Sequence, residues 1–408
     1  MQRVTVIGAG IVGLLTALEL RRRGHRVRLL SEGIAEGASF AAAGMLAPAA
    51  EIQYGQGPLW DIMREAGDLH RDLARRLPDA GYRDDSTLVV GRDAADFAAL
   101  RDLAAVQRST GAEVRELTGA ALHREESALR RGLAGGTLLA RDHQVDPRLL
   151  AAAVRAALTA ETAEHVGPPV EIRCETVTGC DDLSADRIVL AAGLGVPAID
   201  GPHRALDLNL RPVRGDILRL RVPPSLLLPG EENLVAHTVR AIVRGRPVYL
   251  VPRADRTLVL GATSREDDLA GTSAGGVLQL LQDAAEILPA VRETELIEVT
   301  TRDRPGTPDD LPLLGAVPGD ERVIISTGYH RHGILLSAWA ARCTADLIDG
   351  IPPDPSTAAL LHAVRPHRFT RGAVDDPAAA SAPSSTASAP SSTTSTTEFS
   401  VPALEEAR

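Results

Sequence analysis

The chain has 408 residues, 44% of them hydrophobic, which is enough for more than one domain-sized core. Its formal net charge is −10, and it contains no lysine, so all 44 basic side chains are arginines. An acidic chain without a basic block argues against nucleic acid as the main partner, and the absence of lysine excludes chemistry at a lysine amine. The three cysteines show no C-x-x-C spacing, which predicts free thiols in a reducing compartment.

Nothing in the sequence predicts export or membrane insertion. The apolar N-terminal run carries Glu19 and lacks a clear cleavage site, so we do not expect a signal peptide. No uninterrupted apolar run reaches about 18 residues, so we expect no transmembrane helix. These features predict a cytoplasmic protein.

Residues 3–15 combine a short apolar β-branched run, a glycine-rich turn and the start of a helix. Gly8, Gly10 and Gly13 have the G-x-G-x-x-G spacing of dinucleotide-binding turns. The first glycine permits the tight turn, the second lets the backbone approach a pyrophosphate, and the third lets helix and strand pack closely. The helix N-terminus offers N–H groups and the positive end of its dipole to the phosphates. A glycine turn that binds nothing is the alternative, and the strand–turn–helix context disfavours it.

The next residues continue a parallel nucleotide-binding fold. A helix is expected over 11–23, ending at Gly24, and a second parallel strand over 26–30. An acidic residue near the end of that strand would bind a ribose hydroxyl. Its usual position falls on Ser31, with Glu32 one place later, so both residues are candidates.

Residues 37–51 form a second unusual segment because almost all of them are small. Small side chains let the backbone come close to something flat or bulky. An ordinary alanine-rich helix is the alternative, but Gly44 and Pro48 interrupt that pattern. We therefore predict that this segment approaches a cofactor.

Apolar periodicity predicts the remaining elements. Helices are expected over 60–77, 94–109, 146–158 and 274–288, with a closing helix that ends near residue 348. Strands are expected over 88–90, 132–139, 171–178 and 187–192, with a strand, loop and helix start over 323–336. The strand-rich stretches 209–221 and 248–261 are typical of an antiparallel sheet. From about residue 370 the chain is rich in Ala, Ser, Thr and Pro, which predicts a disordered tail.

Several motifs in order resemble the D-amino acid oxidase-like family of FAD oxidoreductases, and most closely its glycine oxidases of thiamine biosynthesis. The similarity covers about residues 1–369 and departs from the family pattern at Ser31, Ser264 and residues 194–195. The motifs are the N-terminal glycine turn, AAAGML at 41–46, VDPR at 145–148, VPR at 251–253, RPGT at 304–307 and GYHRHGILL at 328–336.

The resemblance implies an α/β fold with a Rossmann-type FAD-binding domain and a substrate domain built on a large antiparallel sheet. The FAD-binding domain is expected to comprise residues 1–80, 140–205 and 305–369. The substrate domain is expected to comprise residues 81–139 and 206–304, with 370–408 as the tail. The family also implies a homo-oligomer.

The resemblance further implies a non-covalent FAD. Its contacts are expected at both ends of the dinucleotide and around the flavin ring. They carry over to Gly8, Gly10, Ile11, Val12, Gly13, Ser31, Glu32, Ala38, Ser39, Ala43, Gly44, Met45, Val177, Gly193, Tyr329, His330, Arg331, His332, Gly333, Ile334 and Leu335.

For the substrate, the resemblance implies that Arg304 binds a carboxylate, with Tyr249 and Arg331 beside it. An arginine fork takes a carboxylate through two parallel charge-assisted hydrogen bonds. Pro305 restricts Arg304 to an extended backbone and so aims its side chain. Taken alone, any one arginine among 44 is more often a surface ion-pair residue, and Tyr249 reads equally as a half-buried sheet residue. The family placement reverses this for Arg304.

His330 and His332 lie at i and i+2, a spacing that raises the question of a metal. No third ligand is spaced with them and no H-E-x-x-H motif exists, so we expect no metal and assign both to packing and hydrogen bonding around the flavin.

The implied reaction is the oxidative deamination of glycine to glyoxylate, ammonia and hydrogen peroxide, whose imine would supply the thiazole of thiamine. Two alternatives stay open. One is a D-amino acid or N-methylglycine (sarcosine) oxidase or dehydrogenase of the same family. Pocket volume would decide between these substrates, and the electron acceptor would decide between oxidase and dehydrogenase. The other is a flavoprotein without turnover, which the joint presence of Arg304, Tyr249 and Arg331 disfavours.

Overall fold

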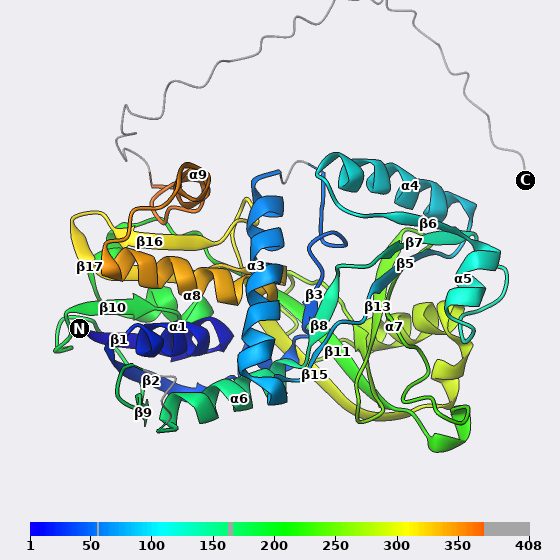
Figure 1. Ribbon diagram of the computed structural model, residues 1–408, viewed down its shortest axis with the longest axis horizontal. Helices are drawn as coiled ribbons and strands as arrows, with labels where there is room; N and C mark the ends of the chain where they lie inside the picture. The colour runs from blue at the N-terminus through cyan, green and yellow to red at the C-terminus, as the bar shows by residue number, and fades with distance from the viewer. Residues whose placement is uncertain (55–56, 162–165, 371–408) are drawn as a thin grey trace, which may run out of the picture. The chain divides into compact units, whose positions relative to one another are not determined.

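Two large β-sheets organise the computed structural model, which describes residues 1–54, 57–161 and 166–370 (Figure 1). The described residues belong to one unit, Met1–Arg371. The tail predicted from about residue 370 lies almost wholly outside the described residues. The domain boundaries given above stay a prediction.

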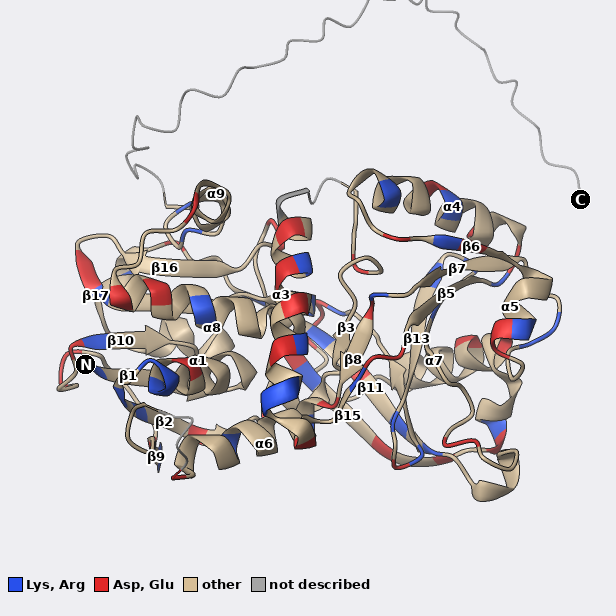
Figure 2. Ribbon diagram, in the orientation of Figure 1, with Lys and Arg blue, Asp and Glu red and all other residues tan. Residues whose placement is uncertain are grey.

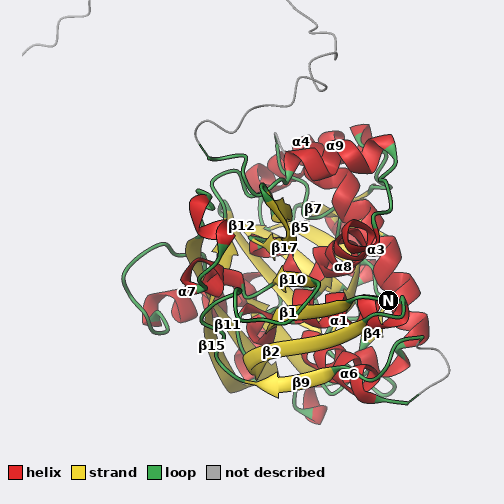
Figure 3. Cartoon of the chain, turned by 90° about the vertical axis from the view of Figure 1, so that its left-hand side faces the viewer, coloured by secondary structure: helices red, strands yellow, loops and turns green. Residues whose placement is uncertain are grey.

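The first sheet has six strands in the order β16-β17-β10-β1-β2-β9, and every pair except β16–β17 is parallel. This is the Rossmann-type sheet that the sequence predicted. Figure 3 shows five of its strands, β17, β10, β1, β2 and β9, stacked in that order. Its strands are β1 Arg3–Ala9, β2 Arg26–Ile34, β9 Glu171–Cys174, β10 Arg187–Leu190, β16 Leu313–Val317 and β17 Asp320–Thr327.

The helices over this sheet follow the predicted periodicity. Helices α1 and α8 pack against each other, and α3 and α6 pack on α8 and α1. Charged residues of both signs alternate along α3 (Figure 2), where Asp68 pairs with Arg71 one turn away at 2.9 Å. The bounds are α1 Ile11–Arg22, α2 Ala38–Ala41, α3 Gly57–Arg76, α6 Pro147–Thr159, α8 Gly333–Asp349 and α9 Pro355–Ala363. None of the described helices combines the length and apolar character needed to cross a membrane.

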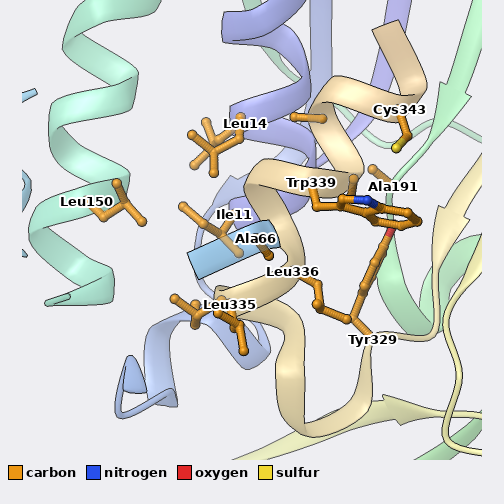
Figure 4. Packing of buried hydrophobic residues seen from close by; sticks show 14 of the residues in the cluster. Ile11, Leu14, Ala66, Leu150, Ala191, Tyr329, Leu335, Leu336, Trp339 and Cys343 are labelled. Atoms are coloured by element: carbon orange, nitrogen blue, oxygen red, sulfur yellow. The ribbon is translucent and has the colours of Figure 1, made fainter. Parts of the chain in front are cut away.

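The core under α8 is built from large apolar side chains. Trp339 is fully buried and lies beside Tyr329, Leu336 and Cys343 (Figure 4). The Tyr329 hydroxyl is buried away from water, but it lies 2.8 Å from Ser326 Oγ and is hydrogen-bonded to it. The phenol of Tyr329 therefore belongs to this core.

The second sheet has eight strands in the order β15-β11-β14-β13-β12-β5-β7-β6. All its pairs are antiparallel except β12–β5, so the predicted large antiparallel sheet is confirmed with one parallel pair inside it. Its strands are β5 Thr87–Gly91, β6 Arg115–Thr118, β7 Gly135–Leu139, β11 Arg211–Arg221, β12 Thr238–Val243, β13 Arg246–Pro252, β14 Thr257–Gly261 and β15 Glu295–Gly306.

Strands β12 and β15 were not predicted. Strand β15 is an edge strand in which only Thr300 and Gly306 are buried, so it lacks the apolar alternation by which strands are recognised. Only pairing with β11 identifies it as a strand.

The remaining elements complete the layers. A small sheet joins β3 Met45–Leu46, β8 His143–Val145 and β4 Tyr82–Arg83, and the helices α4 Ala94–Ser109, α5 Gly119–Glu125 and α7 Ala274–Ile287 accompany the eight-stranded sheet. Short 3₁₀ helices span Pro78–Ala80, Gly193–Ala198, Pro202–Ala205, Pro224–Leu226, Pro289–Glu293 and His330–His332.

The register of the eight-stranded sheet places five residues in one row across neighbouring strands. Cα partners run from Val89 to Arg240, Tyr249, Gly261 and Ile217. Directly paired residues of adjacent strands point to the same face of a sheet. The row therefore presents an arginine and a tyrosine side by side on one face.

Candidate active site

A cavity of about 1190 Å³ runs from the glycine turn after β1 to the face of the eight-stranded sheet that carries this row. Its wall combines segments far apart in the sequence. They come from residues 7–12, 30–53, 175–178, 191–199, 240–249, 262–264, 302–305 and 326–335. A space of this size accommodates a dinucleotide together with a small substrate.

The three glycines of the N-terminal turn differ in what a side chain at each position would meet. Gly8 has φ +104°, and a Cβ there would lie 2.5 Å from the Ala191 carbonyl oxygen. A Cβ at Gly13 would lie 1.9 Å from the Gly8 carbonyl oxygen, so helix and strand could not pack. A Cβ at Gly10 would meet only Ser39 Oγ, at 3.5 Å. The protein itself therefore requires Gly8 and Gly13, whereas Gly10 keeps the backbone bare toward the cavity.

The bare backbone at Gly10 fits the pyrophosphate of a dinucleotide. It is the N-cap of α1, whose first turn contains no acidic residue. The first helical N–H, at Ile11, donates to Ser39 Oγ at 3.0 Å, which brings a second polar group to the same point. These residues could hold FAD phosphates through N–H and O–H donors.

The residues expected to contact FAD, with one exception, line this cavity. The exception is Gly13, which was expected to bind the cofactor as well as to pack. A Cβ at Gly13 would lie 1.9 Å from the Gly8 carbonyl oxygen, so close packing requires this glycine. The cofactor contacts of the others stay predictions.

The predicted ribose end contains both candidate residues. The Ser31 hydroxyl donates to the Gly33 carbonyl at 2.8 Å, and the Glu32 carboxylate accepts a hydrogen bond from Thr176 Oγ1 at 2.8 Å. Val177, placed by resemblance, follows directly in the same wall. Of the two candidates, Glu32 offers a carboxylate as hydrogen-bond acceptor, which suits a ribose hydroxyl, and the ribose contact of either residue stays a prediction.

The small-residue segment 37–51 is held by two arginines, the buried Arg253 and the half-buried Arg148. Arg253 donates to the Ala43 carbonyl and to Gln144 Oε1. The Arg148 guanidinium lies 3.6 Å from the Phe40 ring centroid and donates to the Phe40 carbonyl at 3.2 Å. These contacts tie the segment to β8, α6 and the end of β13.

Gly44, in the same segment, lies where no side chain would fit. A Cβ at this position would lie 1.9 Å from the Val145 carbonyl oxygen. The glycine is therefore required by close packing on β8, while Ala43, Gly44 and Met45 still border the cavity.

At the other end of the cavity, Arg304 and Tyr249 lie on the eight-stranded sheet. Arg304 Nη1 donates to the Thr263 carbonyl at 3.3 Å, and within the described residues Arg304 has no carboxylate partner. Burial lowers the pKa of Arg304, but the group starts from 12.5 and remains charged near neutral pH. Burial also raises the pKa of Tyr249, against the opposite effect of Arg304 and Arg331, so its phenol stays protonated. A protonated phenol and a free guanidinium both donate hydrogen bonds to an anion.

Arg331 is the third predicted substrate residue and also lines the cavity. Its side chain is exposed, and no ion pair of Arg331 occurs among the residues that the structure describes. Its charge acts on Tyr249, Arg304 and Glu51. The structure thus brings the three predicted substrate residues together.

Two charged residues of this site were missed from the sequence. Glu51 Oε1 forms an ion pair with Arg240 Nη1, and both residues line the cavity. Although burial acts to raise it, attraction to Arg240, Arg331 and His332 lowers the pKa of Glu51 to about 2. Glu51 ends the small-residue segment, but only the pairing of β12 with β13 brings Arg240 beside Tyr249. With three arginines and one carboxylate, this end of the cavity is cationic.

The two histidines beside Arg331 are neutral. His330 has φ +44°, and its Nδ1 lies 3.1 Å from Asp310 Oδ1. Burial lowers the pKa of His330 to about 4 and also lowers the pKa of His332. Within the described ranges, no group of three or more His, Cys, Asp or Glu residues is arranged to hold a metal ion.

The fold and the site define a dinucleotide-dependent enzyme with an anion-binding end. The sequence matches the family model "DAO: FAD dependent oxidoreductase" over residues 3–347, and the chain belongs to this family. The chain is therefore an FAD-dependent oxidoreductase.

Relatives within the family are similar over most of this chain. It is 30% identical over 362 residues to a glycine oxidase of Geobacillus kaustophilus, covering 85% of this chain and 92% of that one. It is also 30% identical over 374 residues to the bifunctional protein ThiO/ThiG of Nostoc sp., covering 86% of this chain but 53% of that protein. The chain thus spans about half the length of the bifunctional relatives. The crystal structure of the Geobacillus glycine oxidase matches with a TM-score of 0.75 at 28% identity, over 86% of this chain and 96% of that one.

Gly10→Val tests the cofactor end. The new side chain would occupy the space that Gly10 leaves for the pyrophosphate, and its Cβ would meet only Ser39 Oγ, at 3.5 Å. We expect FAD to bind at least about tenfold more weakly, which corresponds to about 1.4 kcal/mol. Titration of apoprotein with FAD by flavin fluorescence measures this. Gly275→Ala, where a Cβ meets only Ser273 Oγ at 3.9 Å, is the control. Unchanged FAD affinity in Gly10→Val would place the pyrophosphate elsewhere.

Asp142 sets a pH dependence of stability. It is buried and accepts hydrogen bonds from the backbone N–H groups of Ala49 at 3.0 Å and Ala50 at 2.7 Å, directly before Glu51. Burial raises the pKa of Asp142 from 3.8 to about 7. Its contribution to folding is therefore complete below about pH 4 and is lost as the pH rises through about 7.

Asp142→Asn should remove this titration. The free energy of unfolding of the wild type relative to the variant should fall between pH 4 and pH 7.5, by at most about 4 kcal/mol at 1.36 kcal/mol per pKa unit. Urea unfolding followed by circular dichroism across this range measures the difference. Asp181→Asn, at an exposed carboxylate, is the control. A wild-type-to-variant difference that does not change with pH would contradict the shifted pKa.

Proposed function

We propose that the protein is an oxidase of glycine and other small amino acids. Glycine, water and oxygen would yield glyoxylate, ammonia and hydrogen peroxide. The observation that carries this proposal is the Arg304 guanidinium, which has no carboxylate partner among the described residues and lies with Tyr249 at the cationic end of the FAD cavity. The glycine oxidase that resembles this chain over 92% of its own length supports the choice of substrate.

The side chains at this end suit one small amino acid. Arg304 would take the carboxylate by two charge-assisted hydrogen bonds, and the Tyr249 hydroxyl would donate a third. Three nearby arginines disfavour a further positive charge, so they lower the pKa of the substrate ammonium and favour the neutral amine that can be oxidised. FAD, when bound, supplies the acceptor for the two electrons that leave the α-carbon as hydride.

A larger amine is the second candidate, and the cavity wall favours it in one respect. Beyond Tyr249 the wall is apolar and includes Leu100, Leu103, Ile242 and Pro247. A methyl group on nitrogen or on the α-carbon would meet apolar surface there. N-methylglycine and small D-amino acids are therefore the alternatives to glycine.

The cellular setting is part of the proposal. Cys174, Cys180 and Cys343 are free thiols, which supports a reducing cytoplasm. The similarity to ThiO/ThiG supports hand-off of the glycine imine to thiazole synthesis for thiamine. The homo-oligomer implied by the family resemblance is likewise proposed.

A substrate panel tests the proposed function. Purified holoenzyme is mixed with glycine, N-methylglycine, and the D and L forms of alanine and proline, and hydrogen peroxide is measured. We expect peroxide with glycine and with at least one of the larger amines. Loss of flavin colour without peroxide would show that the flavin is reduced by the amine and that an electron acceptor other than oxygen reoxidises it. No change in colour with any amine under anaerobic conditions would contradict an amine oxidase.

Arg304→Lys tests the carboxylate contact. Lysine keeps the charge but loses the planar fork, so we expect KM for glycine to rise at least about tenfold while FAD content is unchanged. Steady-state peroxide production measures KM. Arg292→Ala, at an exposed arginine, is the control. An unchanged KM in Arg304→Lys would show that the carboxylate binds elsewhere.

A further inference from the structure

The Arg304 guanidinium lies against bare backbone. A Cβ built on Gly215 would come within 2.3, 2.4 and 2.5 Å of Nη2, Nη1 and Cζ of Arg304. Val213 is the direct partner of Arg304 across the β11–β15 pair, and Gly215 is two residues further along the same face. Because Gly215 has no side chain, the guanidinium group can lie flat on β11.

The same device occurs beside it for the tyrosine. A Cβ on Gly261 would lie 2.3 Å from the Tyr249 hydroxyl oxygen, and Gly261 is the direct cross-strand partner of Tyr249. The neighbouring strands β11 and β14 thus each have a glycine, Gly215 and Gly261, at the position where the side chain of a proposed substrate-binding residue lies.

Asp216, on the other face of β11, fixes Thr263, whose carbonyl is the second contact of Arg304. Asp216 is 0% exposed, and its carboxylate accepts hydrogen bonds from Thr263 Oγ1 and Thr301 Oγ1, both at 2.7 Å. The backbone N–H of Asp216 donates to Thr263 Oγ1, also at 2.7 Å. Thr263 is therefore fixed by its side chain, and its carbonyl is the group that accepts from Arg304.

We propose that Gly215 and Asp216 are positioning residues for Arg304. Gly215 provides the surface on which the guanidinium lies, and Asp216 sets the Thr263 carbonyl that orients it. An arginine side chain loses rotamer entropy when it is held in one orientation, and Arg304 lacks a carboxylate partner among the described residues. These two contacts hold the fork before the substrate arrives. The inference rests on the proposed function, in which Arg304 binds the substrate carboxylate.

Gly215→Ala tests the surface contact. The new methyl group meets the far end of a flexible side chain, so the protein should fold normally while the guanidinium is displaced. We expect KM for glycine to rise at least about tenfold and kcat to stay within about threefold, because the carboxylate contact is present in both ground and transition states. Gly271→Ala, where a Cβ meets nothing within 4 Å, is the control and should match the wild type.

Thr263→Val tests the contact between Asp216 and Thr263. It removes the hydroxyl that Asp216 holds and keeps the shape of the side chain, whereas Thr263→Ser keeps the hydroxyl. We expect KM to rise in the valine variant and to return to within about threefold of the wild type in the serine variant. Melting temperature and FAD content are measured for both, because a merely structural role would change these and leave KM alone.

Acetate binding separates this inference from the proposed function. Acetate has the carboxylate of glycine but no amine, and its binding to holoenzyme is followed through the flavin absorption spectrum. We expect Gly215→Ala and Arg304→Ala to weaken acetate binding by similar factors, even if the wild type oxidises none of the amines in the panel. A folded Gly215→Ala protein with wild-type acetate binding and KM would overturn the positioning role. No acetate binding to the wild type would overturn the carboxylate contact of Arg304 and with it the positioning role, whereas the substrate panel decides the oxidase activity separately.

Discussion

The site depends on the register of the eight-stranded sheet. Pairing of β12, β13, β14 and β11 aligns Arg240, Tyr249, Gly261 and Ile217 in one row. A shift of one residue in any of these strands would turn its members to the other face. Such a shift would remove the tyrosine from the cavity or place a side chain where Gly261 leaves room for it.

Charge at this end of the cavity follows from the same arrangement. One buried carboxylate, Glu51, pairs with Arg240, and Arg304 and Arg331 remain for an anion. Guanidinium groups without a counter-ion inside a protein are costly unless a ligand completes them. The free-energy cost of these unpaired charges is reduced here because Arg331 is exposed to water and Arg304 donates to the Thr263 carbonyl. The fold thus leaves two guanidinium groups in the cavity available to an anion.

Much of the fold could be predicted because its signals are local. The turn at Gly8 and Gly13, the helices 94–109 and 146–158, and the parallel strands of the first sheet all have periodic or steric signatures within a few residues. The edge strand β15 and strand β12 could not be predicted in this way. Their residues are ordered by neighbours that lie far away in the chain.

By itself, the sequence determined a dinucleotide-binding turn, a small-residue segment and, through ordered motifs, an FAD oxidoreductase. The role of Arg304 as carboxylate ligand was predicted from the family resemblance and stays a prediction. Backbone sterics and family motifs are local properties, so a linear reading finds them. Only the tertiary structure decided that Glu51 and Arg240 line the cavity and that the guanidinium of Arg304 lies against Gly215. These contacts join residues far apart in the chain, such as Glu51 and Arg240, which are 189 positions apart, so no local sequence signal could reveal them. The contact of Gly215 with Arg304 further depends on the register of β11 and β15.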